Sequence, residues 1–244
     1  MSAPASFGRL VSAQATVEGR LTLRRGENLL AMVILPAAAL WFLSSLPGST
    51  RTVDAILPGV LALALVASGL VNLAIATGFE RGYGVLKRLG GSPLGRDGLL
   101  VAKLVVVAVI AVAQVVLLVA LAVALGFRAG PDASPAALLA AIALGSATYC
   151  GIGLLLAGTL RAEATLVLAN VLFLVALVLG GVLVPIADLP DGLRSIALLS
   201  PVGALAEMFR CALGLGGDFL QNAAVVAVWG IGAALATARL FRWD

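Results

Sequence analysis

Reactive side chains are few in this chain of 244 residues. Histidine is absent and cysteine occurs only as Cys150 and Cys211, which excludes histidine-based metal sites, Ser-His-Asp triads and HExxH metalloproteases. The two lysines, Lys87 and Lys103, do not follow a glycine, so the sequence has no G-x-x-x-x-G-K-[ST] phosphate loop. We therefore expect no catalytic site, no metal site and no ATP site in this chain.

The polar side chains inside the most apolar stretches are neutral, so their chemistry is limited to hydrogen bonding. They are Ser68, Asn72, Gln114, Thr148, Tyr149 and Asn170. Two uses fit them: hydrogen bonds between helices, or the lining of a path for an amphiphilic substrate. The candidates for the path are Asn72, Gln114, Thr148, Tyr149 and Asn170. A proton or ion relay would need ionisable groups at membrane depth, and we expect every charged residue at a span edge or in a loop.

The composition indicates which secondary-structure elements carry these side chains. Hydrophobic residues make up 61% of the chain and charged residues 11%, against about 45–50% and about 25% in soluble domains. Apolar runs cover about 29–47, 55–78, 99–126, 136–158, 164–186 and 219–238. Each approaches or exceeds the roughly 20 residues that cross a bilayer as a helix. The sequence predicts an all-α integral membrane protein, with residues 1–28 as an N-terminal segment and 29–244 as a domain of six transmembrane helices.

The basic residues predict that both termini face the cytoplasm. In that orientation twelve of the sixteen Lys and Arg residues lie inside, and four, namely Arg51, Arg128, Arg194 and Arg210, lie outside. Such an excess is the positive-inside pattern of membrane proteins. It accounts for the net charge of +4, and we expect no nucleic acid partner.

The N-terminal segment has the pattern of an amphipathic helix. Residues 7–27 are too polar to cross the membrane, and their apolar face is formed at helical spacing by Phe7, Leu10, Val11, Gln14, Val17 and Leu21. With arginines largely on the other side, such a helix would lie in the cytoplasmic interface near anionic lipid headgroups. A disordered basic leader is the alternative.

A polar insert separates the second and third runs, and it reads GFERGYGVLKRLGGSPLGRDGL from residue 78 to 99. Glycines and Pro93 end a short helix there, and Leu86 and Leu89 give this helix an apolar edge. We expect that edge to face out of the membrane and dock in a groove of another protein. The alternative is a solvated loop whose basic residues only set orientation. The turn TLRAEAT, at 159–165, would lie at the same membrane face.

The segment from 187 to 218 is amphipathic but too broken for one straight span. It follows Pro185 and contains Pro190 and Pro201. Two short helices that dip into the outer leaflet fit this pattern, because irregular backbone at membrane depth must be covered by protein or line a cavity. A simple external loop is the alternative. Glu207 and Arg210 would lie one turn apart on the second helix.

Two motifs resemble one family. The order Glu80-Arg81-x-x-Gly84-x-Leu86-x-x-Leu89-x-x-x-Pro93 resembles the permeases of ABC exporters of the type-2 class, which include drug-resistance, polysaccharide and lipid exporters. The stretch GGVLVPIADLPDGLRSIALLSPVGALAEMFR is similar to the C-terminal pattern of that family, through Pro185, a Leu-Pro pair at Pro190, and Pro201 with Glu207 and Arg210. The family also has six spans, an amphipathic N-terminal helix and both ends inside.

The resemblance implies where partners bind. The loop after the second span would be a coupling helix that inserts into a cytoplasmic ATPase subunit, through Glu80, Arg81, Gly84, Leu86, Leu89 and Pro93. The turn between the fourth and fifth spans, with Arg161 and Glu163, would be a second contact. ATP and Mg²⁺ would be bound by that separate subunit, since this chain has no phosphate loop. The segment with Pro185, Pro190 and Pro201 would form re-entrant helices at the outer mouth.

The resemblance also implies a role. A second permease half, either another copy or a related chain, would complete a substrate path in the bacterial cytoplasmic membrane. The neutral interior favours a lipophilic or amphipathic cargo, such as a drug, a lipid or a glycan. The alternatives are a secondary transporter, which would show inverted repeats and ionisable coupling residues, and a membrane assembly protein without transport activity.

Overall fold

The structure is a computed structural model that describes residues 6–24, 30–45 and 52–242. All regular elements in these ranges are helical. The ends of the first predicted span, at 29 and 46–47, lie outside the described residues, as do Arg25 and Arg51.

Five helices in the described ranges are long and apolar enough to cross a membrane. The first, Val53–Gly82, is continuous through α4 (Val53–Leu65), the π-helical η2 (Val66–Asn72) and α5 (Leu73–Gly82). The others are α7 (Gly95–Ala124), α8 (Pro135–Thr159), α9 (Ala162–Leu179) and α12 (Phe219–Leu240). They correspond to the last five apolar runs of the sequence, which confirms that part of the predicted span order.

The first apolar run is described only as a shorter apolar helix. It consists of η1 (Leu30–Ile34) and α3 (Leu35–Ser44), and its apolar part covers Met32–Ser44. The bent pair α10 (Asp191–Leu199) and α11 (Pro201–Ala212) would add a sixth spanning unit if it were one broken span, and its two helices meet at 83°. The described residues therefore hold five to six helices of spanning length.

The fifth run ends earlier than its apolar sequence indicates. We expected a span to about residue 186, but α9 ends at Leu179 and is followed by Gly180 and Gly181. Gly181 has a φ of 76°, a backbone conformation that glycine adopts without a steric cost. The next regular element is η3, a 3-10 turn at Ile186–Asp188. The apolar residues after Leu179 thus belong to the connection toward α10.

The helices lie side by side, and the helix from Val53 to Gly82 runs through their middle. In its most apolar part 78% of the residues are buried, compared with 17% in α9 and in α12. A helix that is apolar on all sides and surrounded by others forms the core of such a bundle. The sides of α9 and α12 that are not buried are free to contact lipid or another chain.

Local signals fix where helices begin. Ser134 and Ser200 each accept a hydrogen bond from a backbone N–H in the first turn, of α8 and α11 respectively, and a proline occupies the first position of both helices. Asp218 caps α12 in the same way by accepting from the N–H of Gln221 at 3.0 Å. The caps of α8 and α12 place these helix starts within a residue of the starts of their apolar runs.

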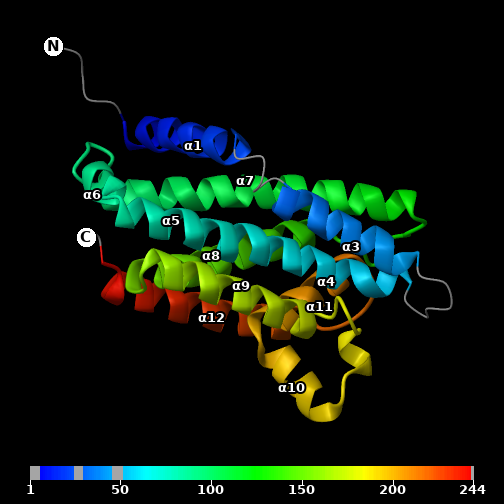
Figure 1. Ribbon diagram of the computed structural model, residues 1–244. Helices are drawn as coiled ribbons and strands as arrows, with labels where there is room; N and C mark the ends of the chain where they lie inside the picture. The colour runs from blue at the N-terminus through cyan, green and yellow to red at the C-terminus, as the bar shows by residue number, and fades with distance from the viewer. Residues whose placement is uncertain (1–5, 25–29, 46–51, 243–244) are drawn as a thin grey trace.

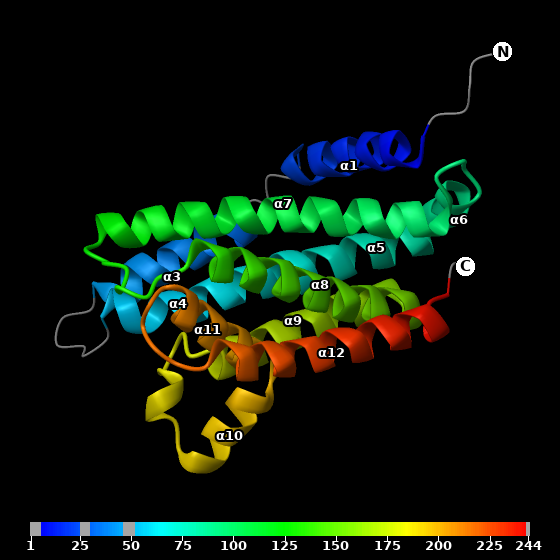
Figure 2. The ribbon, with the colours of Figure 1, turned by 180° about the vertical axis from the view of Figure 1, so that it is seen from behind.

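The N-terminal helix lies outside the bundle. α1 (Phe7–Arg24) runs along α7 at the end of the molecule that also carries α6 (Val85–Gly90) and the end of α12 (Figure 1, and from behind in Figure 2). The predicted helix is therefore confirmed for these residues, and a disordered leader is wrong for them. Its apolar face is divided: Val11 is buried, whereas Phe7, Val17 and Leu21 remain exposed.

At the other end of the molecule, α10 projects from the bundle (Figure 1). The connection between α7 and α8 is held there by the end of α11, because the N–H of Gly130 donates to Leu213 O at 3.0 Å and the N–H of Ser134 donates to Ala212 O at 2.9 Å. The two ends of the molecule thus differ: one carries α1 and α6, and the other carries the bent α10–α11 pair.

Candidate functional site

The polar insert forms a short helix on a tight elbow between α5 and α7. Gly84 has a φ of 68°, which lets the chain turn directly from α5 into α6. The turn after α6 is closed by the hydroxyl of Ser92, which donates to Leu89 O at 2.6 Å. Pro93 is exposed in the same turn. The predicted short helix is therefore present.

The apolar edge of α6 faces inward, which corrects our expectation that it would face a partner. Leu86 is 1% exposed and packs with Val11 of α1 and with Leu94, Leu99 and Ala102. Leu89 is half-buried at the edge of this cluster. Helical spacing identified the apolar edge correctly, but α1 and α7 already supply the groove that it fills.

The outer side of the elbow is aromatic and basic. Tyr83 is 72% exposed, and its ring stacks on Phe79 with ring centres 6.2 Å apart. Lys87 and Arg88 are exposed on α6. These three side chains, Tyr83, Lys87 and Arg88, form what we call the elbow surface.

Three helices meet below the elbow in a buried ion triad. Lys103 of α7 is 2% exposed, and its Nζ lies 3.2 Å from Glu18 Oε1 of α1 and 2.8 Å from Glu80 Oε2 of α5. The side-chain amide of Gln14 donates to the same Glu18 oxygen at 3.1 Å. We had expected Lys103, like every charged residue, at a span edge or in a loop. The structure buries Lys103 and brings it to Glu80, because both side chains point into the junction of α5 and α7.

Arg81 joins the elbow to the turn between α8 and α9. Its guanidinium donates to Leu160 O, immediately before Arg161, the residue that precedes α9. Arg161 and Glu163 are both exposed. The two regions predicted to contact a partner, residues 80–93 and residues 161–163, are therefore joined at Arg81.

The polar residues expected along a substrate path do not share one location. Gln114 donates to Met32 O at 2.6 Å, and Thr148 donates to Val226 O at 3.1 Å, so both hydrogen-bond from one helix to another. Asn170 is exposed and donates to Leu166 O within its own helix at 2.8 Å. Asn72 is half-buried at the end of η2. Tyr149 is the one of the five that lines the apolar pocket between the helices.

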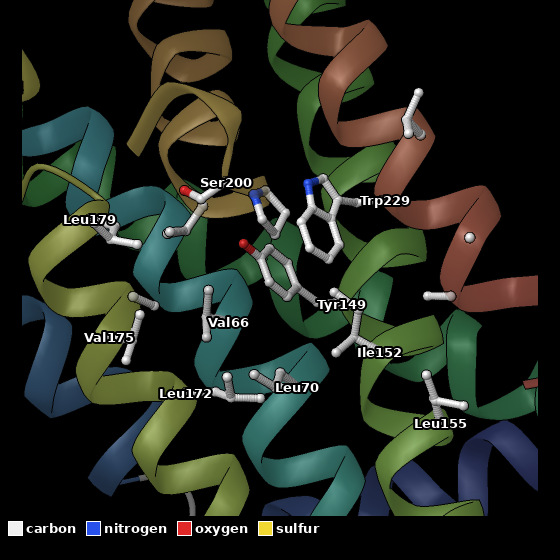
Figure 3. Close-up of a pocket in the computed structure, with 16 residues that line it drawn as sticks. Val66, Leu70, Tyr149, Ile152, Leu155, Leu172, Val175, Leu179, Ser200 and Trp229 are labelled. Atoms are coloured by element: carbon white, nitrogen blue, oxygen red, sulfur yellow. The ribbon is translucent and has the colours of Figure 1, made fainter. Parts of the chain in front are cut away.

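That pocket lies between α8, α9 and α12 and has a volume of about 580 Å³ (Figure 3). Its back is formed by Val66 and Leu70 of η2 together with Tyr149 and Ile152 of α8, and the bend between α10 and α11 closes one end at Ser200. We call it the apolar pocket.

Close backbone packing fixes the position of Tyr149. A Cβ atom built on Gly69 of η2 would lie 2.9 Å from the Cβ of Tyr149, and one built on Gly153 would lie 2.7 Å from Gly69 O. Only glycine permits this approach of α8 to the π-helical segment. π-Helical segments within α-helices frequently occur at functional sites.

The bent pair borders a second, polar cavity of about 400 Å³. Its charged lining residues are Asp188, Arg194, Glu207 and Arg210. Pro185 also lines it, Pro190 precedes α10, and Pro201 begins α11 and contributes to the apolar pocket. The two short helices predicted for this segment are therefore present. Glu207 and Arg210 share the cavity but, within the described part of the chain, form no salt bridge with each other.

Sequence reasoning missed Glu18, Lys103 and Tyr83. Lys103 carried a detectable signal, because a lysine four residues inside an apolar run is an ionisable group at the membrane edge that needs a partner. No comparable signal marked Glu18, since its partner lies 85 residues away in the chain.

Comparison with known proteins agrees with these features. A sequence model of the family described as ABC-2 type transporter matches residues 13–213. The match includes the ion triad, the elbow, the turn between α8 and α9, and the whole bent pair. No curated protein matches the sequence.

Proposed function

This chain belongs to the ABC-2 type transporter family as a multi-pass, non-catalytic membrane permease, and we propose that it forms the substrate path of an exporter driven by a separate ATPase. Permeases of this family generally pair with ATPase subunits. ATP and Mg²⁺ would then be bound by the partner. The cargo that we propose is a lipophilic or amphipathic molecule, because the polar side chains in the middle of the described spans are neutral and the charged ones lie toward the span ends.

The observation that carries this proposal is the two-sided construction of the elbow. One side of α6 is fixed to the bundle by Leu86 and by the turn that follows it, and the other side presents Tyr83, Lys87 and Arg88. A rigid, exposed, basic surface of this kind can accept force from a docked protein without being deformed itself. Arg161 and Glu163 are also exposed, next to the carbonyl that Arg81 holds.

The buried contacts beneath the elbow connect it mechanically to three helices of the permease. Glu80 lies at the end of α5 and holds Lys103 of α7, which in turn holds Glu18 of α1. A displacement of α6 would therefore move α1, α5 and α7 together. In this proposal Gly84 and Pro93 set the shape of the elbow, Arg81 joins it to the second contact, and Leu86 and Leu89 attach it to the bundle.

The remaining parts of the proposal concern sides and partners. The end with α1 and α6 would face the cytoplasm, as the distribution of basic residues predicts, and α1 would lie at the membrane interface as a segment separate from the domain of spans. The bent pair would form the outer mouth, where Glu207 and Arg210 border the polar cavity. A second permease half would cover part of the exposed sides of α9 or α12.

The test uses matched reversals of charge at the two ends of the molecule. Arg88 on the elbow surface and Arg128 in the connection between α7 and α8 are both exposed arginines. Membranes of the native host that express the tagged chain are solubilised, and the ATPase that co-purifies with the wild-type chain is quantified together with ATP turnover in nanodiscs. We expect Arg88→Glu to lose most of the bound ATPase and Arg128→Glu to retain it.

Two further results make the test decisive. Tyr83→Ala should reduce the recovery of the ATPase while the unfolding temperature of the permease stays within about 2 °C of the wild type, since the exposed ring contributes little to packing. If Arg88→Glu and Tyr83→Ala both recovered the ATPase at the wild-type ratio, the elbow surface would not be the docking site. If no ATPase co-purified with the wild-type chain, the transport proposal itself would fail.

A further inference from the structure

The apolar pocket contains one polar group that its surroundings leave unused. Three of its lining residues carry polar side-chain atoms, namely Tyr149, Ser200 and Trp229. The Ser200 hydroxyl donates to Ala197 O at 2.6 Å and accepts from the N–H of Gly203 at 3.1 Å. The indole N–H of Trp229 donates to Leu199 O at 3.0 Å. Both of these side chains are therefore already bonded within the protein.

The hydroxyl of Tyr149 is different. Tyr149 is 3% exposed, and its Oη has no hydrogen-bond partner among the described residues. Figure 3 shows this hydroxyl pointing from α8 into the space between Val66, Ser200 and Trp229. Buried hydroxyl groups are normally hydrogen-bonded, because leaving one unpaired forfeits its hydration without replacement. The missing partner therefore belongs in the pocket.

The pocket has the size and the access of a ligand site. Its volume of about 580 Å³ falls within the roughly 300–1,000 Å³ of sites that hold drug-sized molecules. Its rim includes residues that remain exposed on the sides of the bundle: Val175 of α9 is 46% exposed, and Val228 and Trp229 of α12 are 70% and 48% exposed. Wherever a second permease half leaves these surfaces uncovered they meet lipid, so a ligand would enter from the bilayer between α9 and α12.

We propose that the apolar pocket binds an uncharged lipophilic molecule carrying a single hydroxyl or carbonyl group, which hydrogen-bonds to Tyr149. Of the residues that the structure describes, no charged side chain lines the pocket, so a charged group would lose its hydration with nothing to replace it. A pure hydrocarbon would fit the walls but leave Tyr149 unpaired. The identification of this molecule as the transported cargo rests on the proposed transport function. The binding site itself is a property of the permease alone.

Two substitutions test separately the contribution of the Tyr149 hydroxyl and that of the free volume of the pocket. Tyr149→Phe removes the hydroxyl and keeps the ring. Gly232 borders the pocket, and a Cβ atom built there meets no atom within 4 Å, so Gly232→Phe adds a phenyl ring beside the pocket without displacing the backbone. Ile231→Phe is the matched control, because Ile231 is 61% exposed on the same helix and is not part of the pocket lining.

The experiment measures photolabelling of the purified permease in phosphatidylcholine nanodiscs without an ATPase. The probes are a long-chain alcohol that bears a diazirine and the same probe with its hydroxyl replaced by hydrogen. Labelled peptides are located by mass spectrometry, and the half-saturating mole fraction of each probe is determined. We expect the alcohol to label α8, α9 and α12 at a half-saturating mole fraction about tenfold below that of the hydrocarbon, the effect of one buried neutral hydrogen bond.

The variants decide the outcome. Tyr149→Phe should raise the half-saturating value of the alcohol about tenfold and leave that of the hydrocarbon unchanged. Gly232→Phe should abolish saturable labelling by both probes, and Ile231→Phe should change neither. Equal saturation by both probes, with no effect of Tyr149→Phe, would show that ordinary lipid chains fill the pocket and would overturn the inference. Labelling that does not saturate would overturn it as well.

The thermal stability of the permease, measured without a probe, tests the inference independently. Because the Tyr149 hydroxyl has no partner in the described part of the chain, Tyr149→Phe should leave the unfolding temperature unchanged or raise it. A clear decrease would mean that the hydroxyl is bonded within the protein, which contradicts the inference. No ATPase is present in these measurements, so the two proposals can fail independently. Loss of probe binding would not contradict the transport proposal, and failure to recruit an ATPase would not contradict the binding site.

Discussion

Replacing Lys103 with methionine should detach α1 from the bundle. The substitution keeps the length of the side chain but removes the cation that holds Glu18 and Glu80 at 3.2 and 2.8 Å. Glu18 and Glu80 would both lose this partner in a site where Lys103 itself is 2% exposed. The apolar attachment of α1 is small, since Val11 is its one buried hydrophobic residue among those described.

The magnitude follows from the burial of the three groups. Removing one member of a buried ion pair costs about 3–5 kcal/mol. The two carboxylate side chains are 14% and 18% exposed, so water reaches them in part and the low end of this range applies. A loss of about 3 kcal/mol should raise the population with α1 detached about a hundredfold, because each 1.4 kcal/mol is a factor of ten.

The assay is maleimide labelling of Val11→Cys in a chain whose two native cysteines are replaced by alanine. Val11 is 9% exposed, so the reporter reacts when α1 opens, and its rate should rise about a hundredfold in Lys103→Met. Lys103→Arg keeps the charge, so its labelling rate should stay within about tenfold of the rate in the Val11→Cys chain that retains Lys103. When Glu18→Gln and Glu80→Gln are added to Lys103→Met, the cysteine at position 11 should recover most of its protection from maleimide. An unchanged rate in Lys103→Met would refute the view that the ion triad holds α1.

Other substitutions test the packing and the sidedness of the bundle. Leu86→Asp places a carboxylate in the cluster around α1 and should lower the stability of the permease by more than about 3 kcal/mol, whereas Lys87→Asp on the exposed side of α6 should change it by about 0.5 kcal/mol or less; thermal unfolding in detergent measures both. Gly153→Ala should destabilise by about 1–3 kcal/mol, since its Cβ would lie 2.7 Å from a backbone oxygen of η2, and an unchanged unfolding temperature would contradict that packing. Cysteines at Ser92 and Ser134, at opposite ends of the bundle, should be labelled from opposite sides of a sealed vesicle; labelling of both from one side would disprove the topology.

The order of the helices could be predicted from the sequence because lipid imposes a simple requirement on it. Any stretch of about 20 apolar residues must form a helix whose backbone bonds are satisfied internally. α7, α8 and α12 therefore lie close to their predicted bounds. The fifth span was predicted too long, because hydropathy treats Val182 and Leu183 as membrane residues, while Gly181 has already turned the chain out of the helix.

The contacts of the candidate site were less predictable, since helical spacing gives a face but not the partner of that face. Leu86 and Leu89 form an apolar edge in any helix, and only the three-dimensional structure shows that α1 and α7 cover it. The ion triad depends on a contact across 85 residues, for which no local pattern exists. Likewise, Tyr149 and Thr148 are adjacent and both polar, but only Tyr149 faces the apolar pocket, because the close approach of Gly69 fixes its position.

The ion triad also sets an order for biogenesis. Glu18 precedes its cation by 85 residues, and Glu80 precedes it by 23. At a synthesis rate of roughly 5–20 residues per second, α1 waits on the order of 4–17 s before Lys103 has been made. During that interval its exposed Phe7, Val17 and Leu21, together with its arginines, suit it to rest on a lipid surface. The docking of α1 is thus a late step, and a chain that stops before the third span would present this helix unassembled to the quality-control proteases of the membrane.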